Sequence, residues 1–180
     1  ETIDVHKQQN DHPARFPIQY VIRPRTQEYH DYRGYAGRVS SGVFKVGDEV
    51  VALPSLQSSV IESIHRDVEN LEQAESRQSV TIVLRDDIYI SRGDMLVKKS
   101  EAPELRNDFV SKICWLNKEA MVSGKTYLLQ HGTSYSKAKI SSIDFIQNPA
   151  TLLKDEQAAS IKMNEIAQVQ VRTARPLPVD

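Results

Sequence analysis

The residues best suited to hold a nucleotide form a short segment in the second half of the chain. Ser123-Gly124-Lys125-Thr126 ends like the phosphate-binding loop G-x-x-x-x-G-K-[ST], whose backbone N–H groups surround a phosphate. Glu119 stands where that loop has its first glycine, and its carboxylate would oppose phosphate. The next residues, Tyr127-Leu128-Leu129, favour a strand, whereas a phosphate loop must open a helix. We therefore interpret the segment as a tight turn before a strand.

A second segment resembles a motif that binds guanine. Asn117-Lys118-Glu119-Ala120 is similar to the N-K-x-D motif of GTPases, but Ala120 replaces the carboxylate that would pair with the base. The segment also precedes the loop-like residues, which reverses the usual order of the two motifs. No nucleotide site is predicted within these 180 residues.

Other catalytic chemistries find no support either. Cys114 lies beside Trp115 in an apolar segment and is expected to be a small buried side chain rather than a nucleophile. Asp86 and Asp87 are adjacent, so in a strand they face apart and cannot share acid–base work. The histidines form no i, i+4 pair, and we predict no metal site from them: His6, His12, His30, His65 and His131.

Length and composition limit the class of protein. The chain of 180 residues is long enough for one domain or two small ones. No apolar run approaches the roughly 20 residues that cross a bilayer. A net charge of −1 argues against a non-specific nucleic-acid binder, and one cysteine fits a reducing compartment. We expect a cytoplasmic protein with no membrane or nucleic-acid partner.

The elements that must position these residues are strands, because apolar residues recur every second position. Ile18, Tyr20 and Ile22 alternate with more polar neighbours, as do Val80, Ile82 and Leu84. Gly-containing turn signals separate many such short runs, which is typical of antiparallel barrels and sandwiches. The predicted fold class is all-β.

A charged, proline-interrupted segment over Lys98–Asn107 predicts a boundary between two domains. We expect a tail or linker over residues 1–12, a first small antiparallel β-barrel over 13–101, and a second over 102–180. In the second barrel, Ile166–Thr173 is predicted to bury Ala167, Val169 and Val171 while its other face is wet. We expect its partner strand to contain Ile113 and Trp115 or to lie beside them.

One stretch combines aromatic and basic residues and is the candidate interaction surface. Such residues can anchor a protein interface, stack nucleic-acid bases on a barrel, or, in the case of the tyrosines, simply fill the barrel. The candidate interface residues are Arg23, Tyr29, Tyr32, Arg33 and Tyr35.

Several segments resemble a known GTPase superfamily. Residues Gly34–Val50 are similar to the signature G-x-x-G-x-V-x-x-G-x-[IVL]-[KR]-x-G-[DQ]-x-[VIL] of the second domain of translation-factor GTPases such as elongation factor Tu. Ile90–Leu96 resembles the closing I-x-R-G-D-[ML]-[LI] of that domain. Arg15–Pro24 is similar to R-F-P-V-Q-Y-V-x-R-P in the large, GTP-binding subunit of bacterial sulfate adenylyltransferase. Segments around Met121–Tyr127 and Met163–Val169 agree with that subunit.

This resemblance implies that the chain forms the second and third β-barrels of the subunit, similar to domains II and III of elongation factor Tu-like GTPases. GTP and Mg²⁺ would then bind upstream of Glu1, and the chain itself would carry no catalytic, cofactor or metal site. In this family the subunit hydrolyses GTP to drive a small ATP-sulfurylase subunit, its heterodimer partner, which makes adenosine 5′-phosphosulfate from ATP and sulfate. The alternative is the tRNA-contacting barrels of a translation-type GTPase. Residues Arg25–Tyr32 lengthen one connection relative to the family.

Overall fold

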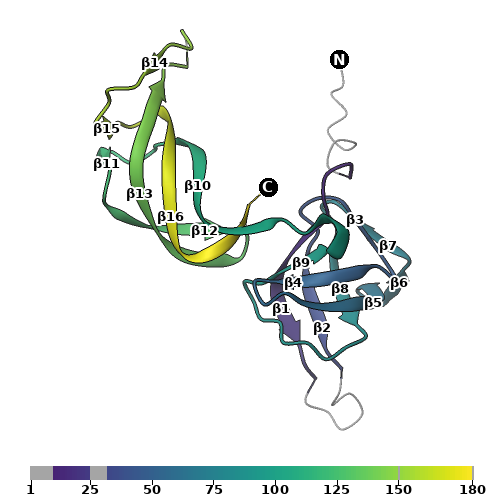
Figure 1. Ribbon diagram of the computed structural model, residues 1–180. Helices are drawn as coiled ribbons and strands as arrows, with labels where there is room; N and C mark the ends of the chain where they lie inside the picture. The colour runs from purple at the N-terminus through teal and green to yellow at the C-terminus, as the bar shows by residue number, and fades with distance from the viewer. Residues whose placement is uncertain (1–9, 25–31, 150, 180) are drawn as a thin grey trace, which may run out of the picture. The chain divides into compact units, whose positions relative to one another are not determined.

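The computed structural model describes residues 10–24, 32–149 and 151–179, and these residues form β-strands joined by turns (Figure 1). The predicted all-β class is confirmed. The chain divides into two compact units, one running to Pro103 together with Gly132–Ser134, and the other comprising Glu104–His131 and the residues from Tyr135 onward. Within the described part, no helix has the length and apolarity needed to cross a bilayer.

The described residues of unit 1 form nine strands, of which six pair in a ring. The antiparallel order β4-β9-β1-β2-β8-β5 returns to β4, and β6 extends β5 while β3 pairs with β7. The strands are β1 (Arg15–Ile22), β2 (Gly34–Arg38), β3 (Val43–Lys45), β4 (Glu49–Leu53), β5 (Gln57–Arg66), β6 (Glu69–Leu71), β7 (Gln73–Glu75), β8 (Ser79–Leu84) and β9 (Met95–Lys98). A short 3₁₀ turn, η2 (Lys99–Glu101), follows β9.

The core of unit 1 follows the alternation in β8 but not throughout β1. Val80, Ile82 and Leu84 are all buried, as predicted. In β1 a register shift between Ile18 and Tyr20 inserts an extra residue against β2. Ile18 is therefore buried while Tyr20 is 65% exposed, and Val21 packs against the core instead. The expected common face of Ile18, Tyr20 and Ile22 is thus wrong beyond the bulge.

The expected tail over residues 1–12 lies outside the described residues except for its last three. Of these, Asn10 contacts the end of β7, because its side-chain amide donates to the Glu75 carboxylate at 3.2 Å and its side-chain carbonyl accepts from Ser76 N at 3.2 Å.

Unit 2 is built on long, curved strands. Its main sheet has the order β10-β16-β13-β12, β14 pairs with β13, and β11 pairs with β15. Among the described residues these pairings do not form a ring. The strands are β10 (Glu104–Cys114), β11 (Met121–Val122), β12 (Thr126–His131), β13 (Ser134–Gln147), β14 (Lys154–Asp155), β15 (Ser160–Ile161) and β16 (Ile166–Val179).

The predicted faces of β16 are confirmed. Ala167, Val169 and Val171 are at most 4% exposed and join the core of unit 2. Ile113 on β10 lies opposite Ala167, and Trp115 N donates to Glu165 O at 3.0 Å, so the predicted partner strand is also confirmed.

The outer face of β16 is less open to water than predicted. Gln168 and Gln170 are half-buried, and both side-chain amides donate to the Asp144 carboxylate, at 3.0 and 2.9 Å. Asp144 reaches them because it occupies a register shift in β13 between Ile143 and Phe145.

Candidate interaction site

Four of the five predicted interface residues lie at one end of the paired strands β1 and β2. The two strands pair antiparallel as far as Ile22 opposite Gly34, so residues that follow β1 and precede β2 lie at the same end. Arg23, Tyr32 and Arg33 are placed there by this pairing, and Tyr35 lies just inside β2. Tyr29, the fifth candidate, lies outside the described residues.

Three of these side chains, those of Tyr32, Arg33 and Tyr35, line a surface pocket of about 390 Å³ in unit 1. Its other walls come from the end of β8 and from Glu62 on β5, far away in sequence. Arg33 forms an ion pair with Asp87, whose side chain is more exposed than that of its partner. The lining residues are Tyr32, Arg33, Tyr35, Glu62, Val83, Leu84, Arg85, Asp86 and Asp87.

Tyr35 belongs to the barrel core rather than to an interface. Only 1% of the residue is exposed, and its hydroxyl donates to Ile88 O at 3.1 Å. Burial raises the pKa of the Tyr35 phenol, although the charges of Arg33 and Arg23 partly oppose the shift. The alternative that the tyrosines fill the barrel therefore holds for Tyr35.

Tyr32 and Arg23 remain accessible to different degrees. Tyr32 is half-buried over the glycine that opens β2, since a Cβ built on Gly34 would lie 2.9 Å from the Tyr32 hydroxyl. Burial raises the pKa of Tyr32 as well. Arg23 is exposed. The residues that line the pocket offer hydrogen-bonding groups and charges of both signs. They do not include a nucleophile held next to a general base.

The two nucleotide-like segments form turns. Gly124 adopts a φ of +86° and its N–H donates to Ile140 O at 2.8 Å, immediately before β12. The tight turn before a strand is confirmed. In the other segment, Asn117 Oδ1 accepts from Glu119 N at 3.0 Å, and Glu119 O accepts from the Trp115 indole at 2.7 Å. Both contacts fold that segment into a local loop.

The expectation for Cys114 is wrong. Its side chain is exposed because Ile113 takes the inward position of β10 opposite Ala167, which turns Cys114 outward. Asp86 and Asp87 have different partners, although they follow β8 rather than lie in a strand as expected: Asp86 accepts from the Ser59 hydroxyl at 2.8 Å, whereas Asp87 pairs with Arg33. His6 and His30 lie outside the described residues. No group of His, Cys, Asp and Glu suited to a metal ion occurs in the described ranges.

Comparison with known proteins identifies relatives across the whole chain. Residues 108–180 match the family model described as GTP-eEF1A C-terminal domain-like. The bifunctional enzyme CysN/CysC of Mycobacterium tuberculosis is 39% identical over 93% of this chain and 27% of its own length. Sulfate adenylyltransferase subunit 1 of Shewanella oneidensis is 36% identical over 100% of this chain. The chain is a homologue of sulfate adenylyltransferase subunit 1. The family indicated by the sequence motifs is confirmed.

The homologous region is part of a longer protein in these relatives. The chain spans 37% of the length of the Shewanella subunit 1 and 27% of the Mycobacterium enzyme. The sulfate adenylyltransferase subunit 1 of Bacteroides fragilis is likewise 36% identical over the whole chain.

Solved structures show the same fold. The crystal structure of sup35 complexed with GDP superposes with a TM-score of 0.80 at 14% identity, over 96% of this chain and 41% of that one. The complex of sup35 with GMPPNP gives a TM-score of 0.81. The expected likeness to the β-domains of translation-type GTPases is therefore confirmed at the level of the fold.

Sequence reasoning missed the far walls of the pocket. Glu62, Arg85 and Asp87 come from β5 and from the end of β8, and nothing local in those segments indicates that they face the β1–β2 hairpin. The pairing of β2 with β8, Gly34 opposite Val83, creates that proximity.

Proposed function

We propose that the chain supplies the two β-units of the GTP-binding subunit of a sulfate adenylyltransferase. The observation that carries this proposal is 36% identity over the whole chain to relatives named sulfate adenylyltransferase subunit 1. In this role the units are not catalytic. They hold a GTPase domain and a small catalytic subunit in positions from which GTP hydrolysis can drive the synthesis of adenosine 5′-phosphosulfate.

The nucleotide chemistry is assigned outside these residues. Both nucleotide-like segments of this chain form local turns, and relatives named subunit 1 are longer than the chain, so GTP and Mg²⁺ would be held by a GTPase domain elsewhere in the full-length protein. The small subunit would join sulfate to the AMP of ATP and release pyrophosphate. We place this heterodimer in the cytoplasm.

The alternative, the tRNA-contacting barrels of a translation-type GTPase, rests on the likeness to sup35. That likeness carries 14% identity, well below the identity to subunit 1. A chain with a net charge of −1 also lacks the overall positive charge typical of tRNA-binding proteins.

The test uses the full-length gene product that contains this chain, purified with and without the small subunit. We expect release of pyrophosphate that requires ATP, sulfate, GTP and both subunits. Deletion of the region corresponding to this chain should abolish the stimulation of pyrophosphate release by GTP. A full-length protein whose GTPase responds to aminoacyl-tRNA, and not to the small subunit, would overturn the proposal.

A second measurement concerns the isolated chain. Calorimetric titration with GTP, or with ATP and Mg²⁺, should give no binding, because Glu119 and Ala120 occupy the positions that phosphate and guanine would require. A micromolar dissociation constant for GTP would contradict the assignment of the nucleotide site to another domain.

A further inference from the structure

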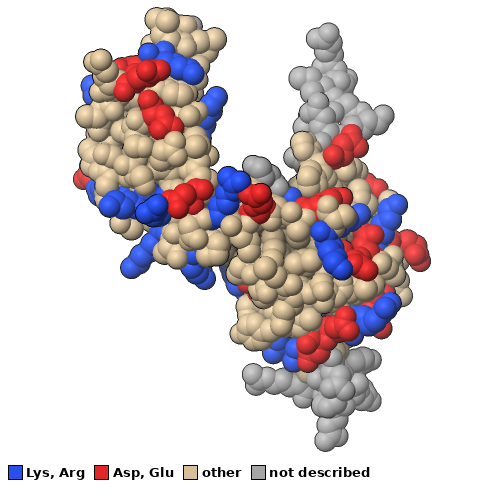
Figure 2. All heavy atoms as spheres, in the orientation of Figure 1, with Lys and Arg blue, Asp and Glu red and all other residues tan. Residues whose placement is uncertain are grey.

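Four exposed cationic side chains lie on β13 and β16 of unit 2. In β13, Ser136, Ala138 and Ile140 point into the core, so Lys137 and Lys139 point outward and are exposed. Arg172 and Arg175 on β16 are exposed as well. Figure 2 shows Lys and Arg side chains gathered at the end of unit 2 where β12, β13 and β16 curve in Figure 1. We call Lys137, Lys139, Arg172 and Arg175 the basic face.

The strand register places two of these charges, Lys139 and Arg172, close together. Lys139 lies directly opposite Arg172, and side chains in such a pair have Cβ atoms about 5 Å apart. Like charges directly opposite each other destabilise a sheet, so the fold bears an electrostatic cost here. Arg172 also donates to Asp108 at 2.6 Å, and that hydrogen bond raises the pKa of the guanidinium. The ion pairs among the described residues include none for Lys137 or Lys139.

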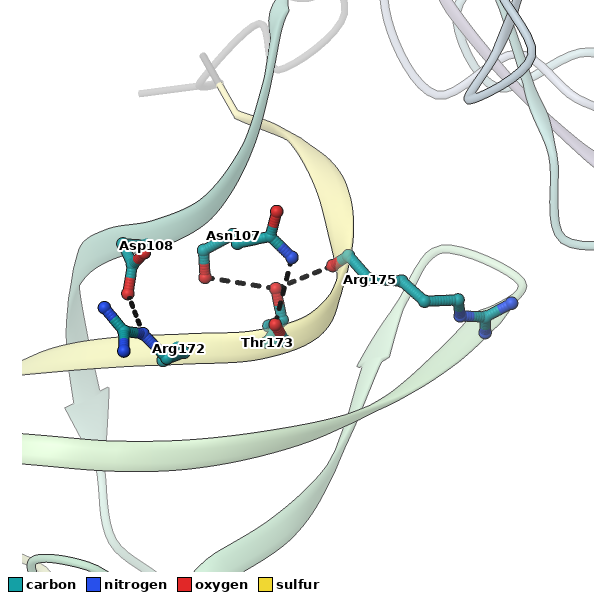
Figure 3. A network of polar contacts seen from close by, with 5 residues as sticks. All are labelled: Asn107, Asp108, Arg172, Thr173 and Arg175. Carbon is teal, nitrogen blue, oxygen red and sulfur yellow. Dashed lines mark hydrogen bonds and ion pairs between the residues drawn. The ribbon is translucent and has the colours of Figure 1, made fainter.

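A polar cluster holds the backbone that carries the two arginines (Figure 3). The register of β10 against β16 breaks at Asn107, which faces the stretch of β16 from Thr173 to Pro176. Thr173 is 4% exposed, and its hydroxyl lies 2.7 Å from Arg175 O and 3.2 Å from Asn107 O. The Asn107 amide donates to Thr173 O at 3.0 Å.

The same irregularity directs Arg175 toward β13. Its guanidinium donates to the carbonyl of Tyr135, beside Lys137. Arg172 and Arg175 are thus fixed on a hydrogen-bonded framework before any partner arrives. A preorganised surface loses less conformational entropy on binding than a set of free side chains.

We propose that the basic face is a docking surface for an acidic segment of a protein partner. The choice of partner rests on the proposed function, which makes it the small catalytic subunit. The basic face carries four cations, of which Arg172 is paired with the Asp108 carboxylate, and such a face complements an acidic protein surface. A protein is favoured over RNA because Asp108 lies within the face and would repel a phosphate backbone, whereas a protein can meet both signs of charge. Charge complementarity of this kind chiefly accelerates association and selects the partner.

The test uses the full-length subunit and the small subunit, with binding measured by surface plasmon resonance. The variant Lys137→Glu/Lys139→Glu reverses two charges without touching the polar cluster. We expect its dissociation constant to rise at least tenfold, mainly through a slower association rate. The difference from wild type should shrink at high salt, because exposed charges are screened. Lys137→Gln/Lys139→Gln should give an intermediate loss.

Lys118→Glu/Lys162→Glu is the matched control, since both lysines are exposed in unit 2 but lie outside the basic face. We expect it to change affinity less than twofold. Trp115 fluorescence confirms that unit 2 stays folded in each variant.

The possible results separate the two proposals. If wild type binds the small subunit and the basic-face variant binds equally well, the docking proposal is wrong while the proposed function stands. If wild type forms no complex, the proposed function fails together with this choice of partner. Binding of duplex RNA by wild type that is lost in Lys137→Glu/Lys139→Glu would assign the face to nucleic acid instead.

Discussion

At the scale of single residues, the motif glycine Gly37 shows how sequence becomes a packing constraint. It lies opposite Ile18 at the β1 bulge, where a Cβ would come within 2.4 Å of Pro17 O and 3.0 Å of Phe16 Cζ. The carbonyl belongs to backbone in the barrel wall and cannot move aside easily. Gly37→Ala should therefore lower the free energy of unfolding of unit 1 by about 3 kcal/mol, measured by urea denaturation.

Gly47→Ala is the comparison for that prediction. Gly47 has a φ of +90°, and a Cβ there meets nothing within 4 Å. Alanine at this position is unfavourable only because the backbone is left-handed, which should lower the free energy of unfolding by about 1 kcal/mol. Equal losses for the two variants would show that the contact with Pro17 O is not what requires Gly37.

Because of Tyr35, the stability of unit 1 should decrease as the pH rises in the alkaline range. Burial raises its pKa above 10.0, the ordinary value for tyrosine, so folding favours the neutral phenol. That contribution is complete below pH 10 and is lost as the pH rises through the folded-state pKa. Tyr35→Phe should cost about 1 kcal/mol at pH 7 through the lost bond to Ile88 O. The gap between the two proteins should narrow at pH 10.5. Parallel stability profiles would contradict this assignment.

At the scale of elements, the two faces of the sheet formed by β10 and β16 should tolerate charged side chains very differently. Val171 is 4% exposed in the core of unit 2, so Val171→Asp buries an unpaired carboxylate and should unfold that unit. Val110 on the neighbouring strand is 53% exposed on the opposite face. Val110→Asp should change stability by less than about 1 kcal/mol. Chemical denaturation of both decides the matter, and a larger loss for Val110→Asp would mean that the faces are reversed.

For Gln170→Asp, the structure predicts a larger loss of stability than strand alternation alone does. A wet-face position predicts that Gln170→Asp costs less than about 0.5 kcal/mol. Because the Gln170 amide donates to Asp144, the substitution removes a donor and sets two carboxylates side by side. We now expect a loss of about 1 kcal/mol in the same denaturation experiment. A loss below 0.5 kcal/mol would show that the contact with Asp144 adds nothing.

At the scale of the whole molecule, each unit has its own hydrophobic core. The buried cluster of unit 1 ends at Leu96, and that of unit 2 uses residues from Phe109 onward. The single tryptophan, Trp115, packs edge-on against Tyr127 at 5.4 Å and so reports on unit 2 alone.

Separate cores predict separate unfolding. Val171→Asp should remove the transition in Trp115 fluorescence and leave the part of the circular-dichroism transition that belongs to unit 1. Gly37→Ala should shift only the part of the circular-dichroism transition that belongs to unit 1, and should leave the Trp115 fluorescence transition unchanged. If either substitution abolishes both transitions together, the units unfold as one cooperative body.

Alternation and motifs in the sequence determined the all-β class, the inward face of β16, the turn at Gly124 and the family. These are local properties, since side-chain direction in a strand and the backbone freedom of glycine depend on near neighbours. Tertiary structure alone decided that a bulge turns Tyr20 outward, that Asp87 pairs with Arg33, that Asp144 meets Gln170, and that Lys139 faces Arg172. Each depends on the register between strands far apart in the chain, which is fixed only when the sheets pair and the cores pack.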